Sequence, residues 1–161
     1  IGRRAFLAAV RAEENGYKTA LLAIVKAHFG VPSLRKAIPI LYGQDFAPSD
    51  LAALAQSVDE AARQGDHEAI KILKEAGRAL SELVFSLIYQ AGALLPIYCY
   101  GSVLTKSETV FSAFSEEVMG RFPFAKIGKP RMSPAMGALL CAARQKGLDV
   151  KAIATALARQ A

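Results

Sequence analysis

Apolar residues recur every three or four positions through most of this 161-residue chain, and this period constrains its fold more than any other feature. Such spacing gathers apolar side chains on one face of an α-helix. We therefore predict a mostly helical chain, with a short segment over 34–42 that is interrupted at Pro39. The longer helices are expected over residues 4–14, 19–29, 49–64, 66–90, 107–122, 134–146 and 149–159.

The clearest helix boundary lies at Gly65 and Asp66. Glycine readily adopts the left-handed conformation that ends a helix, and an aspartate side chain accepts hydrogen bonds from the free amides that begin the next one. We expect two long helices to meet there at a tight corner. By the same reasoning Thr19 caps the second helix, and Ser49 or Asp50 caps the helix that ends at the corner.

Two short apolar segments, 95–100 and 124–127, lack the helical period and are predicted to be strands, the first of them buried. Two strands do not form a stable sheet by themselves, and a strand–helix–strand–helix order predicts parallel strands with partners elsewhere. Because Ile1 is not a methionine, we expect the chain to be a processed or excised piece of a longer protein. Its preceding part would supply the partner strands.

These elements predict an α/β fold that is mostly helical and contains only about two short strands. We divide the chain into a helical segment over 1–92, a strand–helix–strand–helix part over 93–147 and a terminal helix over 148–161.

Charge and apolar content exclude two classes of partner. The net charge of +6 comes from 20 Lys+Arg and 14 Asp+Glu that are scattered along the chain, so no nucleic-acid interface is expected. The two basic clusters, at 2–4 and 126–131, are short; solvated helix faces or attraction to a phosphate-bearing ligand account for them. The longest apolar stretch, 83–100, is interrupted by Pro96, so no membrane span is expected.

The residue types that bind metals are too few and too far apart to predict a metal site. Cys99 and Cys141 each lie in an apolar run, and we expect both to be buried free thiols in a reducing cytoplasm. His28 and His67 are expected on helix surfaces.

The sequence most suggestive of a ligand site is Gly101-Ser102, at the end of the first predicted strand. Glycine has no Cβ and lets a base or phosphate approach the backbone, although an ordinary turn explains the same residues. Lys106 is either a phosphate contact or a solvated lysine. The adjacent acids 13–14 and 116–117 point apart on a helix and are poor candidates for paired catalytic carboxylates.

The order of these motifs resembles the BadF/BadG/BcrA/BcrD ATPase family, and within it the N-acetylglucosamine kinases. The resemblance extends from Ile1 to about Gly147. The residues that carry it are Ile1-Gly2-Arg3-Arg4-Ala5, Arg11-Ala12, Thr19-Ala20-Leu21, Ala52-x-x-Ala55, Ala61-Ala62-x-x-Gly65-Asp66-x-x-Ala69-x-x-Ile72-Leu73-x-x-Ala76, Gly101-Ser102-Val103 and Pro134-x-x-Gly137-Ala138.

The resemblance implies the carboxyl-terminal part of an actin-like ATPase fold, with ribonuclease-H-like domains, a helical insertion and ATP in the cleft between domains. Gly101 and Ser102 would contact the adenosine, and Ala52 would leave room for a flat base. Ile1 would line the sugar pocket. Gly137 and Ala138 would permit close packing of the helix that crosses toward the other domain; simple helix packing is the alternative for the alanines.

The family's amino-terminal phosphate loop, its catalytic aspartate and its second phosphate loop have no counterpart in this sequence. We therefore expect no catalytic residue and no metal ligand here, with ATP and Mg²⁺ held mainly by a missing amino-terminal half. The implied function is the nucleotide-binding half of a cytoplasmic amino-sugar kinase that acts on N-acetylglucosamine or glucosamine, inactive as a fragment.

Two alternatives and one partner stay open. An activator ATPase of a 2-hydroxyacyl-CoA dehydratase would need cysteines that hold an iron–sulfur cluster, and the placing of Cys99 and Cys141 argues against it. A helical interaction module without a nucleotide site would leave the strand and the Gly-Ser turn unexplained. Association into a homodimer stays open under each hypothesis.

Overall fold

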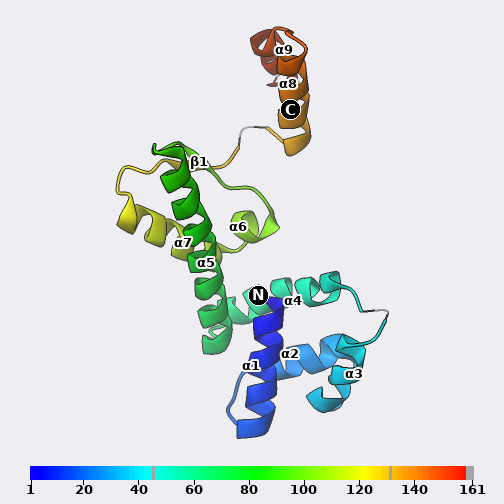
Figure 1. The fold of residues 1–161 in the computed structure, drawn as a ribbon. Helices are drawn as coiled ribbons and strands as arrows, with labels where there is room; N and C mark the ends of the chain where they lie inside the picture. The colour runs from blue at the N-terminus through cyan, green and yellow to red at the C-terminus, as the bar shows by residue number, and fades with distance from the viewer. Residues whose placement is uncertain (45, 131, 159–161) are drawn as a thin grey trace.

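The computed structural model describes residues 1–44, 46–130 and 132–158, and these are mostly helical, with two short parallel strands (Figure 1). The predicted fold class is confirmed. In chain order the elements are α1 (Gly2–Asn15), α2 (Ala20–Phe29), the 3-10 helix η1 (Leu34–Ala37), α3 (Ile38–Leu41), α4 (Pro48–Arg63), α5 (His67–Ala91), β1 (Ile97–Tyr98), α6 (Ser102–Lys106), α7 (Glu108–Arg121), β2 (Ile127–Gly128), α8 (Pro134–Gln145) and α9 (Val150–Ala158).

The amino-terminal helices α1, α2 and α4 pack with the start of α5 around one apolar core (Figure 1). Three small alanines and Phe6 form the α1 side of this core, and Leu and Val side chains come from the other helices. Full burial of a Leu or Val side chain contributes about 2 kcal/mol. The fully or almost fully buried residues include Ala5, Ala9, Leu21, Val25, Leu54, Val58 and Leu73.

The corner between α4 and α5 forms as predicted. Gly65 has a left-handed φ of 89°, and the Asp66 carboxylate accepts a hydrogen bond from Ala69 N at 2.9 Å. The same carboxylate accepts from the Thr19 hydroxyl at 2.9 Å and from Ala20 N at 2.6 Å, which joins the starts of α2 and α5. Burial acts to raise the pKa of Asp66, but these hydrogen bonds outweigh it and the pKa is lowered.

The other predicted boundaries are mostly right to within a few residues. Thr19 caps α2 by accepting from Leu21 N at 3.2 Å. The cap predicted for α4 at Ser49 or Asp50 is wrong, because the helix begins earlier, at Pro48, where the missing proline N–H is not needed. The segment 34–42 is interrupted, as predicted, but the break between η1 and α3 precedes Pro39. His28 and His67 are exposed, as predicted.

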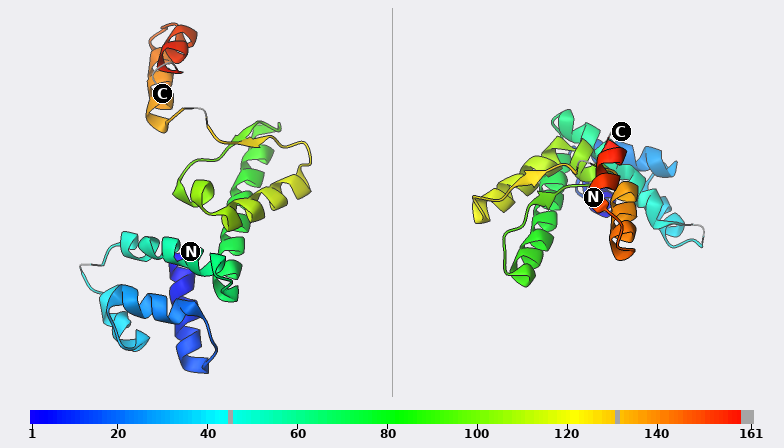
Figure 2. Two further views of the ribbon diagram at one scale, coloured as in Figure 1. Left: turned by 180° about the vertical axis from the view of Figure 1, so that it is seen from behind. Right: turned by 90° about the horizontal axis from the view of Figure 1, so that it is seen from above.

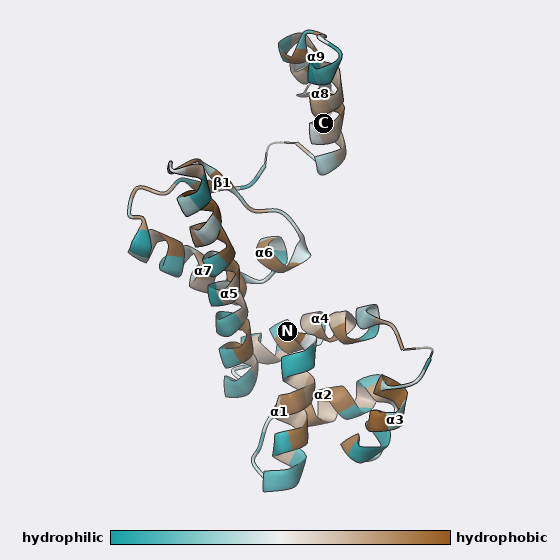
Figure 3. Ribbon diagram, in the orientation of Figure 1, coloured by the Kyte–Doolittle hydropathy of each residue, from teal (hydrophilic) through white to brown (hydrophobic). Residues whose placement is uncertain are grey.

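The long helix α5 packs against α7, and Gly77 sets how closely they approach. A Cβ added at Gly77 would lie 2.6 Å from Val110 O and 2.9 Å from Phe114 N. No real Cβ makes such contacts, so the two helix backbones meet here because residue 77 has no side chain. Large apolar side chains of α5 are also exposed, among them Leu83 and Leu87. Figure 3 shows strongly hydrophobic residues along α5.

Both strands exist and are parallel, with Ile97 paired to Ile127 and Tyr98 to Gly128. The prediction that the first strand is buried is wrong: Tyr98 and Tyr100 are 64% and 63% exposed, and only Cys99 is buried. The physical reason is that β2 is its single neighbour among the described residues, so its other edge is uncovered. The second strand begins at Ile127, later than predicted, because 122–125 forms a turn closed by a 2.9 Å bond from Ala125 N to Phe122 O.

The helices α8 and α9 pack against each other and stand apart from the rest of the molecule in both side views (Figures 1 and 2). Asp149 caps α9, as predicted, by accepting from Lys151 N at 2.9 Å. The predicted end of that helix at Arg159, and Arg131 in the basic cluster, lie outside the described residues. The prediction that Cys141 is buried is wrong, because α8 has few described neighbours to cover it.

The predictions on membrane spans and on Gly137 can be compared with the helices of the structure. No helix within the described ranges is long and apolar enough to cross a membrane. A Cβ added at Gly137 would meet nothing within 4 Å, so the close packing expected there has no partner in the described part of the chain.

Candidate functional site

A cleft of about 840 Å³ lies between α4 and the corner where α6 meets α7. It brings together three of the four site residues predicted from the sequence, Ile1, Ala52 and Ser102, which come from the chain start, α4 and α6. The fourth, Gly101, directly precedes Ser102 as the N-cap of α6. The cleft thus brings together residues at least 50 positions apart in sequence.

Gly101 is required by its backbone conformation. Its φ of 101° and ψ of 149° lie in a region that is essentially restricted to glycine. A Cβ at this position would meet nothing within 4 Å, so the constraint is conformational and not steric. This glycine turns the chain from β1 into α6. The short helix α6 was not predicted, because five residues carry too little apolar period to identify.

One wall of the cleft is the exposed side of α4, where the small side chains of Ala52, Ala53 and Ala55 project little from the helix. The facing wall carries the exposed hydroxyl of Ser102 and the exposed side chain of Lys106. No carboxylate of the described residues forms an ion pair with Lys106. The cleft therefore combines an alanine-lined surface with a hydroxyl and an available positive charge.

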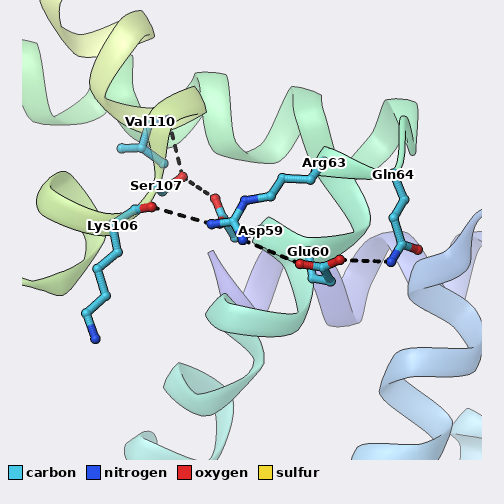
Figure 4. A network of polar contacts seen from close by, with 7 residues as sticks. All are labelled: Asp59, Glu60, Arg63, Gln64, Lys106, Ser107 and Val110. Carbon is cyan, nitrogen blue, oxygen red and sulfur yellow. Dashed lines mark hydrogen bonds and ion pairs between the residues drawn. The ribbon is translucent and has the colours of Figure 1, made fainter.

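A polar network joins the two walls at their base, and it was not predicted (Figure 4). The carboxylate of Asp59, a residue that is 9% exposed, accepts hydrogen bonds from the Ser107 hydroxyl and from Arg63. Arg63 also donates to Glu60 at 3.4 Å and to the Lys106 carbonyl at 3.5 Å. Figure 4 shows the Lys106 side chain pointing away from this network. Its charge is consequently not used by the network.

A sequence signal for this network exists. Asp59 is a charged residue directly after Val58, on the side of α4 that packs against the rest of the molecule. Arg63 follows it by one helical turn, at the spacing of an i,i+4 ion pair. Such a buried acid needs partners. The sequence gives no means to identify Ser107 as the second partner, because it lies 48 residues away.

Other acidic groups take part in local contacts. Glu13 accepts from Lys26 at 2.6 Å and from Leu34 N at 2.9 Å, and the side-chain bond to Lys26 is the main cause of its lowered pKa. Glu117 pairs with Arg78 at 3.0 Å. Within the described ranges no three His, Cys, Asp or Glu side chains cluster as metal ligands. The cleft as described can hold a ligand, but it presents no pair of free carboxylates for catalysis.

Comparison with known protein families agrees with the sequence motifs. The model of the BadF/BadG/BcrA/BcrD ATPase family matches residues 1–142, which include α1 to α7, both strands and most of α8. The match spans every residue that lines the cleft. This chain belongs to the BadF/BadG/BcrA/BcrD ATPase family, whose members are ATP-binding proteins of the actin-like type.

Proposed function

We propose that the chain forms the carboxyl-terminal, nucleotide-facing half of an ATP-dependent amino-sugar kinase. The full protein would transfer the γ-phosphoryl group of ATP to the 6-hydroxyl of N-acetylglucosamine or glucosamine. The observation that carries the proposal is the cleft that gathers Ile1, Ala52 and Ser102. All three belong to the kinase-like motifs of the sequence, although they lie far apart along the chain.

The cleft fits a nucleotide in size and in chemistry. Its volume of about 840 Å³ falls in the range typical of small-molecule sites. The alanine surface around Ala52 suits the flat face of a base, and the Ser102 hydroxyl can donate or accept one hydrogen bond. Lys106 supplies a positive charge for a phosphate. We expect Ile1, which is half-buried and lines the same cleft, to contact the sugar.

The proposal divides the work between two halves. Asp59 and Glu60, the acids of the cleft, both accept hydrogen bonds from Arg63, so we do not assign either of them to Mg²⁺ or to proton transfer. An upstream aspartate would accept the proton of the sugar hydroxyl, and upstream loops would hold the phosphates and Mg²⁺. The exposed face of α5 and the open edge of β1 are consistent with packing against that half or against a second copy. The proposal places the enzyme in the cytoplasm.

The positions of the cysteines favour the kinase over the dehydratase-activator alternative. Cys99 packs with Phe85, Phe114 and Val118, and burial raises the pKa of its thiol. A thiol in such surroundings is a poor cluster ligand, because the thiolate is the form that binds metal. Cys141 lies on α8, a separate element. A helical module without a nucleotide site would give no reason for the Gly101–Ser102 turn that follows the strand.

The test is an ADP-release assay on the full-length protein with N-acetylglucosamine, glucosamine and glucose. We expect turnover with an amino sugar, and a loss of activity in Ser102→Ala. Ser112→Ala removes an exposed hydroxyl on α7 outside the cleft and should leave activity unchanged. The isolated 161 residues should show no sugar-dependent ADP release. Absence of turnover with every sugar in the full-length protein would contradict the proposal.

A further inference from the structure

Asp59 is the buried acid that the proposed function leaves without a role. The residue is 9% exposed and lies at the base of the cleft, where α4 meets the α6–α7 corner. Burial of an ionised carboxylate is costly unless several donors satisfy it, so an acid here needs a structural or functional reason. Replacement by an apolar residue would serve packing alone equally well.

The network holds both residues at the joint between α6 and α7. Ser107, the N-cap of α7, accepts from Val110 N at 3.4 Å while its hydroxyl donates to Asp59. Arg63, held by Asp59, donates to the carbonyl of Lys106 at 3.5 Å. Two consecutive residues of the corner are thus attached to α4, Ser107 through the Asp59 carboxylate and Lys106 through Arg63, which the same carboxylate holds (Figure 4).

This attachment acts on the cleft through α6. The helix begins at Ser102 and ends at Lys106, so its last residue is fixed to α4 while its first residue faces the ligand space. Ala52 lies on the same α4, two helical turns before Asp59. The bonds of Asp59 and Arg63 therefore act on the separation between the Ser102 wall and the Ala52 wall, together with the packing of Leu104 and Val110 on the core.

We propose that Asp59 is a positioning residue of the nucleotide cleft, which fixes the Gly101–Ser102 turn at the spacing from α4 that a base and ribose require. This inference rests on the proposed function. Asp59 does not contact the ligand itself; it acts through Ser107 and Arg63.

The chain offers a matched control for a purely structural effect. Thr19 is also an N-cap whose hydroxyl donates to an aspartate of another segment, Asp66, at 2.9 Å. The Thr19–Asp66 pair lies outside the cleft. Removal of either cap hydroxyl should lower stability to a similar degree, but only the one at Ser107 should change nucleotide affinity.

The experiment measures melting temperature and the KM values for ATP and sugar in the full-length protein. The variants are Asp59→Asn, Ser107→Ala, Ser107→Thr and Thr19→Ala. We expect KM for ATP to rise about tenfold in Asp59→Asn and Ser107→Ala, because a hydrogen bond to a charged group is lost. KM for the sugar should stay within about twofold, a change below 0.5 kcal/mol. Ser107→Thr, which keeps the hydroxyl, should retain the wild-type KM for ATP.

The outcomes separate this inference from the proposed function. Suppose that wild type turns over ATP, and that Asp59→Asn, Ser107→Ala and Thr19→Ala all lower the melting temperature to the same degree without changing KM for ATP. Asp59 is then only structural, and the inference fails. If wild type neither binds nor turns over ATP, the proposed function fails, and the inference fails with it. For a variant that melts too early to assay, binding of a fluorescent ATP analogue at 4 °C replaces turnover, and wild-type affinity there overturns the inference.

Discussion

Among the described residues, two aspartates accept a hydrogen bond from a helix-capping hydroxyl, and their surroundings differ. Asp66 accepts from Thr19 and from the backbone amides of Ala20 and Ala69, which satisfies the starts of α2 and α5. Asp59 accepts only from side chains, those of Ser107 and Arg63, and it borders the cleft. The first arrangement holds helix ends together, whereas the second connects a helix to the wall of a site.

The comparison shows that similar hydrogen bonds hold helix ends together at Asp66 and position a wall of the cleft at Asp59. Backbone donors fix Asp66 into the fold itself, so its loss should affect the whole amino-terminal unit. Side-chain donors at Asp59 reach residues next to the proposed ligand turn. The substitutions below test this distinction, beginning with those that should destabilise the fold most.

Asp66→Ala should have the largest effect on stability. The change removes three hydrogen bonds, one of which caps α5, and we expect the free energy of unfolding to fall by about 3 kcal/mol. Urea unfolding followed by circular dichroism measures this. The KM for ATP of the folded fraction should change little. A rise in that KM as large as in Asp59→Asn would remove the distinction between the two aspartates.

Gly77→Ala should be the next most destabilising change. The long helix α5 extends from the amino-terminal core to α7 and so joins the surroundings of Asp66 to those of Asp59. A Cβ added at Gly77 would overlap Val110 O and Phe114 N of α7. Forcing the helices apart should cost about 2 kcal/mol. Thermal unfolding is the measurement, with Gly120→Ala as the control, since a Cβ there meets nothing within 4 Å. Equal melting temperatures for the two variants would show that α5 and α7 are not so close.

Acid should weaken the Asp66 arrangement selectively. The folded-state pKa of Asp66 is lowered from 3.8, so its stabilising effect is complete above that pH and is lost as the pH falls through the lower folded-state pKa. Asp66→Asn should therefore flatten the dependence of unfolding free energy on pH below about 4. Chemical unfolding between pH 2.5 and 6 tests this, and an unchanged slope in the variant would contradict the assignment.

Lys106→Ala should have the smallest effect on stability. The side chain is exposed and makes no ion pair among the described residues, so unfolding free energy should change by less than about 0.5 kcal/mol. KM for ATP should rise about threefold, as expected for loss of one partly solvated charge contact. Steady-state kinetics with Lys151→Ala, on the distant α9, provide the control. Identical kinetics in both variants would exclude Lys106 from the site.

Much of the fold was predictable because its determinants are local. The left-handed glycine at 65, the cap at Asp66 and the apolar period of α5 lie within one stretch of sequence. The burial of the first strand was not predictable, since it depends on which elements cover it. The helix α6 is too short for its period to identify, and the apolar run around Cys141 carries no information about how few neighbours α8 has.

The candidate site also has a part that was predictable from the sequence and a part that was not. Ala52, Ser102 and Ile1 were found through motif order, and the structure places them around one cleft. The bond between Asp59 and Ser107 was missed because its partners are far apart in sequence and neither belongs to a recognised motif. Polar networks formed by long-range packing are the part of a site that one sequence alone does not reveal.

The central claim, that this chain provides the nucleotide-facing wall of an ATP-dependent enzyme, is tested most directly by amide hydrogen exchange of the full-length protein with and without a non-hydrolysable ATP analogue. We expect slower exchange over 101–107 and 52–56 when the analogue is bound, and no change over the start of α5 at 67–76, which lies mostly outside the cleft. Unchanged exchange over both cleft segments at saturating analogue would contradict the claim.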